Sequence, residues 1–175
     1  MKRSIKIIFT SACGAFAIFF MVIYISCTRD KCASVTCSNG GSCNNGICKC
    51  PSGYEGTTCQ TLSRVKFIRN WGVENLTASL TEPAQFAVSI DIGTAGINYV
   101  SIKNLHDYFT TPVTAYVSGD SLIIPVQVVM GKTVTGSGLI YSSNAYGINN
   151  TISMSYQITD NTTHVIDVES ETWHG

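Results

Sequence analysis

The sequence predicts a mainly β protein, in which a small disulfide-rich domain precedes an antiparallel β-barrel or sandwich of about eight strands. Three observations predict this class. Six of the eight cysteines fall within residues 32–59. The chain after Cys59 has no further cysteine and is rich in Val, Ile, Thr and Tyr. Short segments of alternating polar and apolar residues recur in that part, whereas no long pattern with the helical period of 3.6 is present.

The N-terminal segment, residues 1–26, is predicted to be a signal peptide or membrane anchor. Lys2, Arg3 and Lys6 precede a run from Ile7 to Ser26 that carries no charge. A cationic start followed by an apolar run is typical of targeting segments rather than of a fold. The cations favour the cytoplasmic side, so the rest of the chain is expected to be exported.

The end of this run carries a second signal. Ile25-Ser26-Cys27 places a small residue directly before a cysteine and resembles the lipobox of bacterial lipoproteins. The resemblance implies that Cys27 is lipidated and that residues 27–31 form a lipid-anchor tether. Cys13 would then leave with the signal peptide. Two alternatives stay open: an uncut helix, because about 20 apolar residues can span a bilayer, and simple secretion.

Residues 32–59 have the cysteine spacing C-x4-C-x5-C-x4-C-x-C-x8-C. A segment this short cannot bury a sufficient core, so the cysteines are expected to form disulfides in an oxidising compartment. Six cysteines allow 15 pairings. Cys48 and Cys50 lie one residue apart and point to opposite faces of an extended chain, so they should bond to different partners. The segment has no C-x-x-C pair and no histidine, which disfavours a zinc site.

The Asn39-Gly40-Gly41 turn before Cys43 and the ending C-x-C-x-x-G-Y-x-G-x-x-C make residues 32–59 resemble an EGF-like domain. The resemblance implies the disulfides Cys32–Cys43, Cys37–Cys48 and Cys50–Cys59, each contributing about 2–4 kcal/mol. Calcium-binding members carry an acidic pair before the first cysteine. This chain has Arg29-Asp30-Lys31 there, so we expect no metal and no cofactor.

Residues 62–175 are predicted to form the antiparallel β-domain, which follows the EGF-like segment after a linker too short for free movement. Pro125 lacks an N–H, so its strand should lie at an edge or contain a bulge. Residues 104–109 read as a helical turn or a loop. We expect strands at residues 64–71, 85–92, 98–102, 113–117, 122–129, 132–141, 151–159 and 163–169, with turns at 93–96, 118–120, 130–132 and 159–162.

The strings KFIRNWGV, VSGDSLIIPVQVV, VTGSGLIY and ISMSYQITD resemble the lipocalin-like β-module of lipoproteins from the Bacteroidota. In those proteins the module often follows an EGF-like domain. The resemblance implies an antiparallel barrel over most of residues 64–170. Within it we interpret Trp71 as a packing residue at one end of the barrel, because large aromatic side chains mostly serve packing.

No catalytic motif is present: the chain contains neither H-E-x-x-H nor G-x-S-x-G nor a phosphate-binding glycine loop. We interpret His106 as a loop residue, and the acidic residues near the C-terminal end as a solvated strand face. Without the leader, 8 Lys and Arg remain against 11 acids, and no basic stripe suited to nucleic acid is present. The acidic residues that we interpret as a solvated strand face are Asp160, Asp167, Glu169 and Glu171.

These observations predict an extracytoplasmic, membrane-anchored protein of the outer membrane or cell surface. Its expected role is non-enzymatic: interaction with, or binding of, an unknown protein, glycan or small molecule, with no nucleic-acid partner. The alternative is a carrier that encloses a small apolar ligand in the barrel. An apolar cavity lined by inward-facing side chains would favour the carrier, and a barrel filled with side chains would exclude it.

Overall fold

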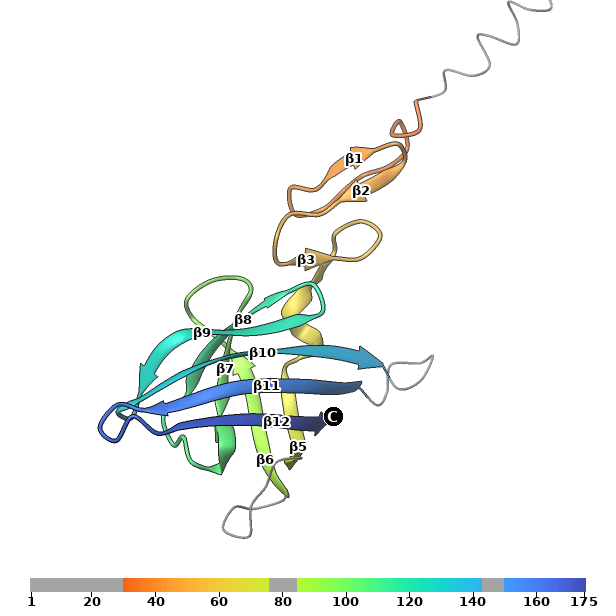
Figure 1. Cartoon of the computed structure of the whole chain (residues 1–175). Coiled ribbons are helices and arrows are strands. Elements are labelled where there is room, and N and C mark those ends of the chain that lie inside the picture. Colours follow the sequence, from red (N-terminus) through yellow and green to blue (C-terminus); the bar gives the residue numbers. More distant parts are fainter. Residues whose placement is uncertain (1–29, 76–84, 143–149) are drawn as a thin grey trace, which may run out of the picture.

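The computed structural model describes residues 30–75, 85–142 and 150–175, and it shows a small N-terminal β-module leading into a barrel (Figure 1). The predicted leader and the predicted lipidation site, Cys27, lie outside the described residues. Within the three described ranges, no helix is both long and apolar enough to cross a bilayer.

The N-terminal module contains two short antiparallel pairs. β1 (Ser42–Asn44) pairs with β2 (Ile47–Lys49), and β3 (Tyr54–Glu55) pairs with β4 (Thr61–Leu62). The β1–β2 hairpin turns through Asn45 and Gly46, whose φ angles are +57° and +88°. A two-residue hairpin of this kind requires positive φ at both positions, which Asn and Gly tolerate best. β4 contains part of the predicted linker, so the linker is itself a strand of this module.

The larger module is a closed barrel of eight antiparallel strands. Each strand pairs with its neighbours in sequence, and β12 pairs with β5 to close the ring. The predicted up-and-down barrel is therefore confirmed, and the sandwich is excluded. The strands are β5 (Arg69–Asn75), β6 (Gln85–Ile92), β7 (Tyr99–Lys103), β8 (Val113–Ser118), β9 (Ser121–Val129), β10 (Lys132–Ser142), β11 (Asn150–Asp160) and β12 (Ile166–His174).

The bulge predicted at Pro125 is confirmed. Gln127 pairs with Val134 and Ile124 pairs with Gly136, so two residues of β9 lie opposite one residue of β10. On the other side, the β8–β9 ladder reaches only as far as the Tyr116–Ile123 pair. Beyond this pair, the side chain of Gln127 makes the hydrogen bonds to β8 that backbone groups of β9 would otherwise make. Its Oε1 accepts from the N–H of Thr114 at 3.0 Å, and its Nε2 donates to the carbonyl of Thr114 at 2.6 Å.

The barrel interior is filled by one continuous cluster of buried apolar side chains. Trp71 and Trp173 are fully buried, and Trp71 Nε1 donates to the Phe67 carbonyl at 2.9 Å. Trp71 is thus a packing residue, as predicted. Two glycines of β10 make room for large neighbours: a Cβ at Gly136 would lie 2.4 Å from the Cβ of Tyr156, and one at Gly138 would lie 2.5 Å from Met154 Sδ. Small positions opposite large ones let the side chains of the interior interdigitate.

Two predicted strands differ from the structure. The segment expected to be extended from residue 64 begins as a 3-10 helix, η1 (Ser63–Lys66), and β5 starts only at Arg69. The helix positions Arg64, whose Nη1 donates to the carbonyls of Gly96 and Tyr99 at 3.2 and 3.1 Å. The last strand starts at Ile166 instead of residue 163, because the carboxylate of Asp160 accepts from the backbone N–H groups that follow it and prolongs the turn.

Candidate functional site

A polar network lies inside the barrel where β11 and β12 pair. Tyr156, Glu171 and Trp173 are all buried. The Tyr156 hydroxyl donates to Glu171 Oε1 at 2.5 Å, and Trp173 Nε1 donates to Glu171 Oε2 at 2.7 Å. Each oxygen of this buried side chain therefore has a hydrogen-bond donor, as a polar group removed from water requires.

His106 joins the network from η2 (Leu105–Asp107), which connects β7 to β8. Its Nδ1 lies 3.2 Å from the Tyr156 hydroxyl oxygen and 3.9 Å from Glu171 Oε1. Because the single hydroxyl proton of Tyr156 goes to Glu171, the hydroxyl oxygen accepts from Nδ1–H of His106. We interpret His106 from the sequence as a loop residue, and it does lie in the connection between β7 and β8. That interpretation is incomplete, because the His106 side chain is only 15% exposed and reaches the interior.

The loop that carries His106 has an unusual backbone. Asn104, His106 and Asp107 have φ angles of +59°, +57° and +49°, a region that non-glycine residues seldom occupy. Asn104 Nδ2 donates to the Ala87 carbonyl at 2.8 Å and to Asp107 Oδ1 at 3.0 Å. Tertiary contacts thus hold three residues in a strained conformation, and the result is that the imidazole points into the barrel.

The interpretation of the C-terminal acids as a solvated face is wrong for two of them. Glu169 is 5% exposed and Glu171 is 1% exposed. The physical reason is the two-residue period of a strand. Trp173 is fully buried, so positions 171 and 169 share its inward face. The Glu-x-Glu-x-Trp spacing in the sequence carried this signal, because a strand that buries its tryptophan must also turn both glutamates inward.

A carboxylate, a phenol and an imidazole thus converge, which is the arrangement that an enzyme hypothesis would require. Two of these groups have almost no exposed surface, since Glu171 and Tyr156 are 1% and 2% exposed, whereas the His106 side chain is 15% exposed. Their geometry instead fastens the β7–β8 connection to β11 and β12. Satisfied buried networks of this kind fix a unique packing. Across the described ranges, no three His, Cys, Asp or Glu side chains are placed to hold a metal ion.

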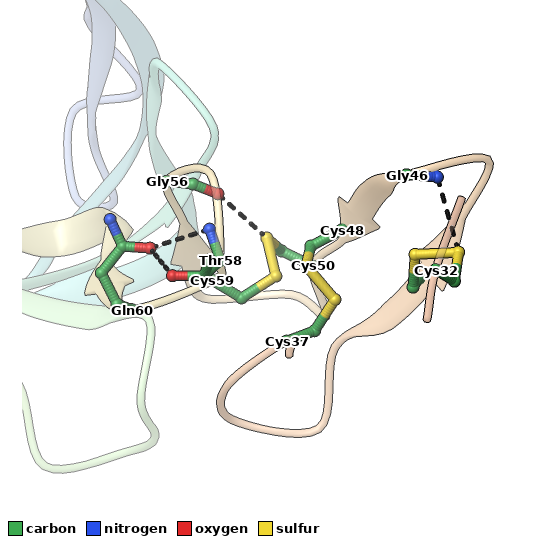
Figure 2. The surroundings of a disulfide bond; sticks show 10 residues. Cys32, Cys37, Gly46, Cys48, Cys50, Gly56, Thr58, Cys59 and Gln60 are labelled. Atoms are coloured by element: carbon green, nitrogen blue, oxygen red, sulfur yellow. Dashed lines mark hydrogen bonds between the residues drawn. A yellow bond between two sulfur atoms is a disulfide. The ribbon is translucent and has the colours of Figure 1, made fainter. Parts of the chain in front are cut away.

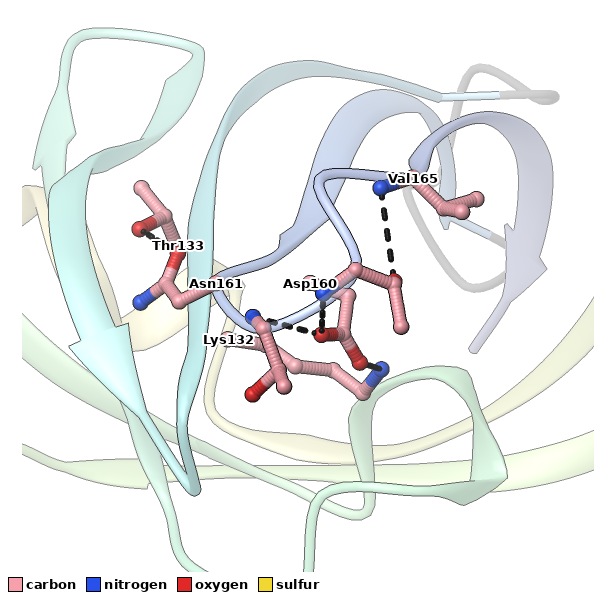
Figure 3. A network of polar contacts seen from close by, with 7 residues as sticks. Lys132, Thr133, Asp160, Asn161 and Val165 are labelled. Carbon is pink, nitrogen blue, oxygen red and sulfur yellow. Dashed lines mark hydrogen bonds and ion pairs between the residues drawn. The ribbon is translucent and has the colours of Figure 1, made fainter.

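A second polar cluster fixes the β11–β12 turn on the outside (Figure 3). Asp160 Oδ2 accepts from Lys132 Nζ at 2.9 Å, and Oδ1 accepts from the N–H groups of Thr162 and Thr163 at 2.8 and 2.9 Å. The hydrogen bond from Lys132, followed by the two backbone N–H groups, holds the pKa of Asp160 well below its usual range. The same bond raises the pKa of Lys132. This carboxylate thus has a structural role in the turn.

The six cysteines of the N-terminal module form three disulfides (Figure 2). The bonded pairs are Cys32–Cys43, Cys37–Cys48 and Cys50–Cys59, which are the pairs that the resemblance implies. Gly41 packs so closely on the last bridge that a Cβ there would lie 2.7 Å from Cys59 Sγ.

The two modules meet through a charged contact at η1. Lys66 Nζ lies 2.8 Å from Glu55 Oε2 in the small module and 2.6 Å from Asp120 Oδ1 in the β8–β9 turn of the barrel. Partial burial lowers the pKa of Lys66, but the hydrogen bonds to Asp120 and Glu55 outweigh it, so the pKa is raised. The backbone adds a further link, because the N–H of Ser63 donates to the carbonyl of Gly53 at 2.9 Å. These contacts join the two modules at η1.

The cysteine framework identifies the small module. Residues 27–59 match the family of EGF-like domains. No solved structure matched the chain. An EGF-like domain with three disulfides indicates an extracellular location, and its combination with an eight-stranded barrel indicates a binding or interaction module. The lipocalin-like resemblance and its setting in the Bacteroidota stay predictions.

Proposed function

We propose that the protein is a membrane-anchored extracytoplasmic lipoprotein that binds another molecule without catalysing a reaction. The observation that carries the proposal is that a disulfide-linked EGF-like domain is joined to a barrel whose interior is filled with side chains. This architecture suits recognition at the surface of the molecule better than uptake into it.

The proposed anchor is a lipid on Cys27. Two sequence features favour this anchor: a small residue lies directly before Cys27, and an uncharged run precedes that cysteine. Several acyl chains anchor a protein stably, whereas a single chain does not. Only four residues separate Cys27 from the first bonded cysteine, so the EGF-like domain would lie near the lipid surface.

We infer from the filled interior of the barrel that the protein neither catalyses a reaction nor carries a ligand. A carrier needs an enclosed apolar cavity, and most of the inward positions here hold large packed side chains such as Trp71, Trp173 and Met154. The carboxylate, phenol and imidazole that converge at Glu171 are mostly buried, with Glu171 itself 1% exposed, which disfavours catalysis there. A protein, glycan or small-molecule partner would therefore bind on the outer surface, and the mildly acidic exported part disfavours nucleic acid.

The test of the anchor is a Cys27→Ser variant expressed with export intact. For the wild-type protein we expect mass spectrometry of the membrane fraction to find Cys27 as the lipidated N-terminal residue. The variant should carry no lipid. Cys13→Ser is the matched control, because it removes a leader cysteine that the proposal does not use, and it should be lipidated normally. An intact Met1 on the wild-type protein would exclude the lipoprotein.

A further inference from the structure

A hollow lies on the barrel wall where β12, β5 and β6 run side by side (Figure 1). The strand register places Glu74 beside Gln85, and it places Gly72 between His174 and Ala87. These five residues are exposed and alternate with buried neighbours, so they face outward. The hollow has a volume of about 390 Å³ and is lined by Gly72, Val73, Glu74, Gln85, Phe86 and His174.

The floor of the hollow is Gly72, a glycine that the fold itself does not require. A Cβ at this position would have the carbonyl oxygen of His174, 3.8 Å away, as its nearest described neighbour, which is an ordinary van der Waals distance. The φ angle of Gly72 is not among the positive ones, so any residue adopts this backbone. Gly136 and Gly138 of β10 differ, because a Cβ there would overlap Tyr156 and Met154.

A glycine without such a reason is costly inside a strand. It loses more conformational freedom on folding than any other residue, and it offers no side chain to pack. A β-branched residue would suit the middle of β5 better. Where neither packing nor the backbone requires glycine, it marks a place where another molecule approaches the backbone closely. The missing side chain at Gly72 therefore indicates an occupant of the hollow.

The rim of the hollow shows which chemistry the occupant has. Glu74 and His174 are 56% and 57% exposed, and Glu74 Oε2 lies 3.8 Å from His174 Nε2, so both side chains border the same space. Gln85 adds an amide that both donates and accepts. Among the described lining residues there is no lysine or arginine, and the single carboxylate would repel an anion. A cation would use that carboxylate alone, whereas hydroxyl groups would use all three side chains.

We propose that this hollow binds one neutral sugar residue of a glycan. The C–H face of the sugar ring lies on the backbone of Gly72 and the methyl group of Ala87. Hydroxyl groups at the edge of the ring donate to Glu74 and exchange hydrogen bonds with Gln85 and His174. An apolar floor with a few convergent polar groups is the usual design of a small-ligand site, and the volume lies within the usual range of ~300–1,000 Å³.

This inference rests on the proposed function, in which the partner binds the outer surface of the barrel. It goes further by assigning the surface and the chemical class of the ligand. The site is open and offers few hydrogen-bonding groups, so the affinity for a single sugar should be low. Several copies anchored on one membrane would bind a repetitive glycan more tightly, a point that depends on the lipid anchor.

The experiment applies the full chain in detergent to an array of neutral glycans, and isothermal titration then measures the affinity for the best one. Gly72→Val should weaken binding about tenfold or more, because its side chain fills the hollow, while the urea midpoint of the barrel stays equal or rises. Glu74→Gln should weaken binding about tenfold without a change of shape. Ser155→Val is the matched control, since it adds the same bulk to an exposed position of β11, and it should bind like the wild type.

Three results would overturn the inference. Binding to no neutral glycan, or binding to cationic ligands instead, would exclude a sugar site. Wild-type affinity in Gly72→Val would place the ligand elsewhere. A lower urea midpoint for Gly72→Val would show that the glycine serves the fold.

The failure of the proposed function gives different results. A Cys27 without lipid would refute the anchor, but a Cys27→Ser variant in detergent should still bind the glycan. A glycan cleaved during incubation would contradict the absence of catalysis while still supporting a sugar site. A lipidated protein that binds no neutral glycan would refute the sugar site alone.

Discussion

Replacing Tyr156 by Phe tests the buried network with a change of one atom. The Tyr156→Phe variant keeps the ring that packs against Gly136 but loses the donor to Glu171 and the acceptor for His106. A hydrogen bond contributes about 0.5–1.5 kcal/mol, and a buried group that loses its partner bears a desolvation cost of about 1–3 kcal/mol as well. We expect the free energy of unfolding to fall by about 2–3 kcal/mol, which is a factor of at least ~30 in the unfolding equilibrium.

Urea denaturation followed by tryptophan fluorescence measures this loss directly. The chain has two tryptophans, Trp71 and Trp173, and both are buried in the barrel, so the signal reports the unfolding of this module. The control is Tyr141→Phe, because Tyr141 is 48% exposed and its hydroxyl can bond to water instead. We expect this variant to change stability by less than about 0.5 kcal/mol.

A double-mutant cycle separates the network from general packing. In a Glu171→Gln background the carboxylate is gone, so Tyr156→Phe should cost about 1 kcal/mol less than in the wild-type protein. Equal costs in the two backgrounds would mean that Tyr156 and Glu171 are not coupled. A loss below about 0.5 kcal/mol for the single variant would refute the claim that the network stabilises the barrel.

Three further predictions follow from the glycine, turn and junction contacts. Gly136→Ala should lower the barrel's unfolding free energy by about 1–3 kcal/mol in the same urea assay, because its Cβ would clash with Tyr156; an unchanged midpoint would contradict the tight packing. Asp160→Asn should destabilise the barrel at pH 7, where the ionised carboxylate contributes in full; the difference should shrink as pH falls below about 4, near the unfolded pKa, and should vanish only below the lowered folded pKa. Lys66→Met should speed proteolysis at the junction, whereas Lys49→Met should not.

Most of the fold could be predicted from the sequence because the patterns that indicate it are local. Alternation over residues 85–92 predicts a strand whatever surrounds it, and the missing N–H of Pro125 requires a bulge once the sheet is closed. The disulfide pairing came from the resemblance of a cysteine pattern, which is also local. The ends of strands and helices were harder to predict where a tertiary contact determines them. The helical turn at Arg64 is one such case, since its guanidinium donates to carbonyls 32 and 35 residues away.

The candidate site was the least accessible part. His106 and Tyr156 are 50 residues apart in sequence, and only the order and register of the closed barrel bring them together. The inward direction of Glu169 and Glu171 could have been read from their spacing to Trp173. The identity of their partners could not, because that depends on strained backbone at Asn104, His106 and Asp107 that no local pattern specifies.

Non-reducing peptide mapping of the native, membrane-extracted protein tests the central claim most directly. An oxidised EGF-like module should give three linked peptide pairs: Cys32 with Cys43, Cys37 with Cys48, and Cys50 with Cys59. Thiols at these positions that react with an alkylating reagent before reduction, or peptides linked in another order, would contradict it.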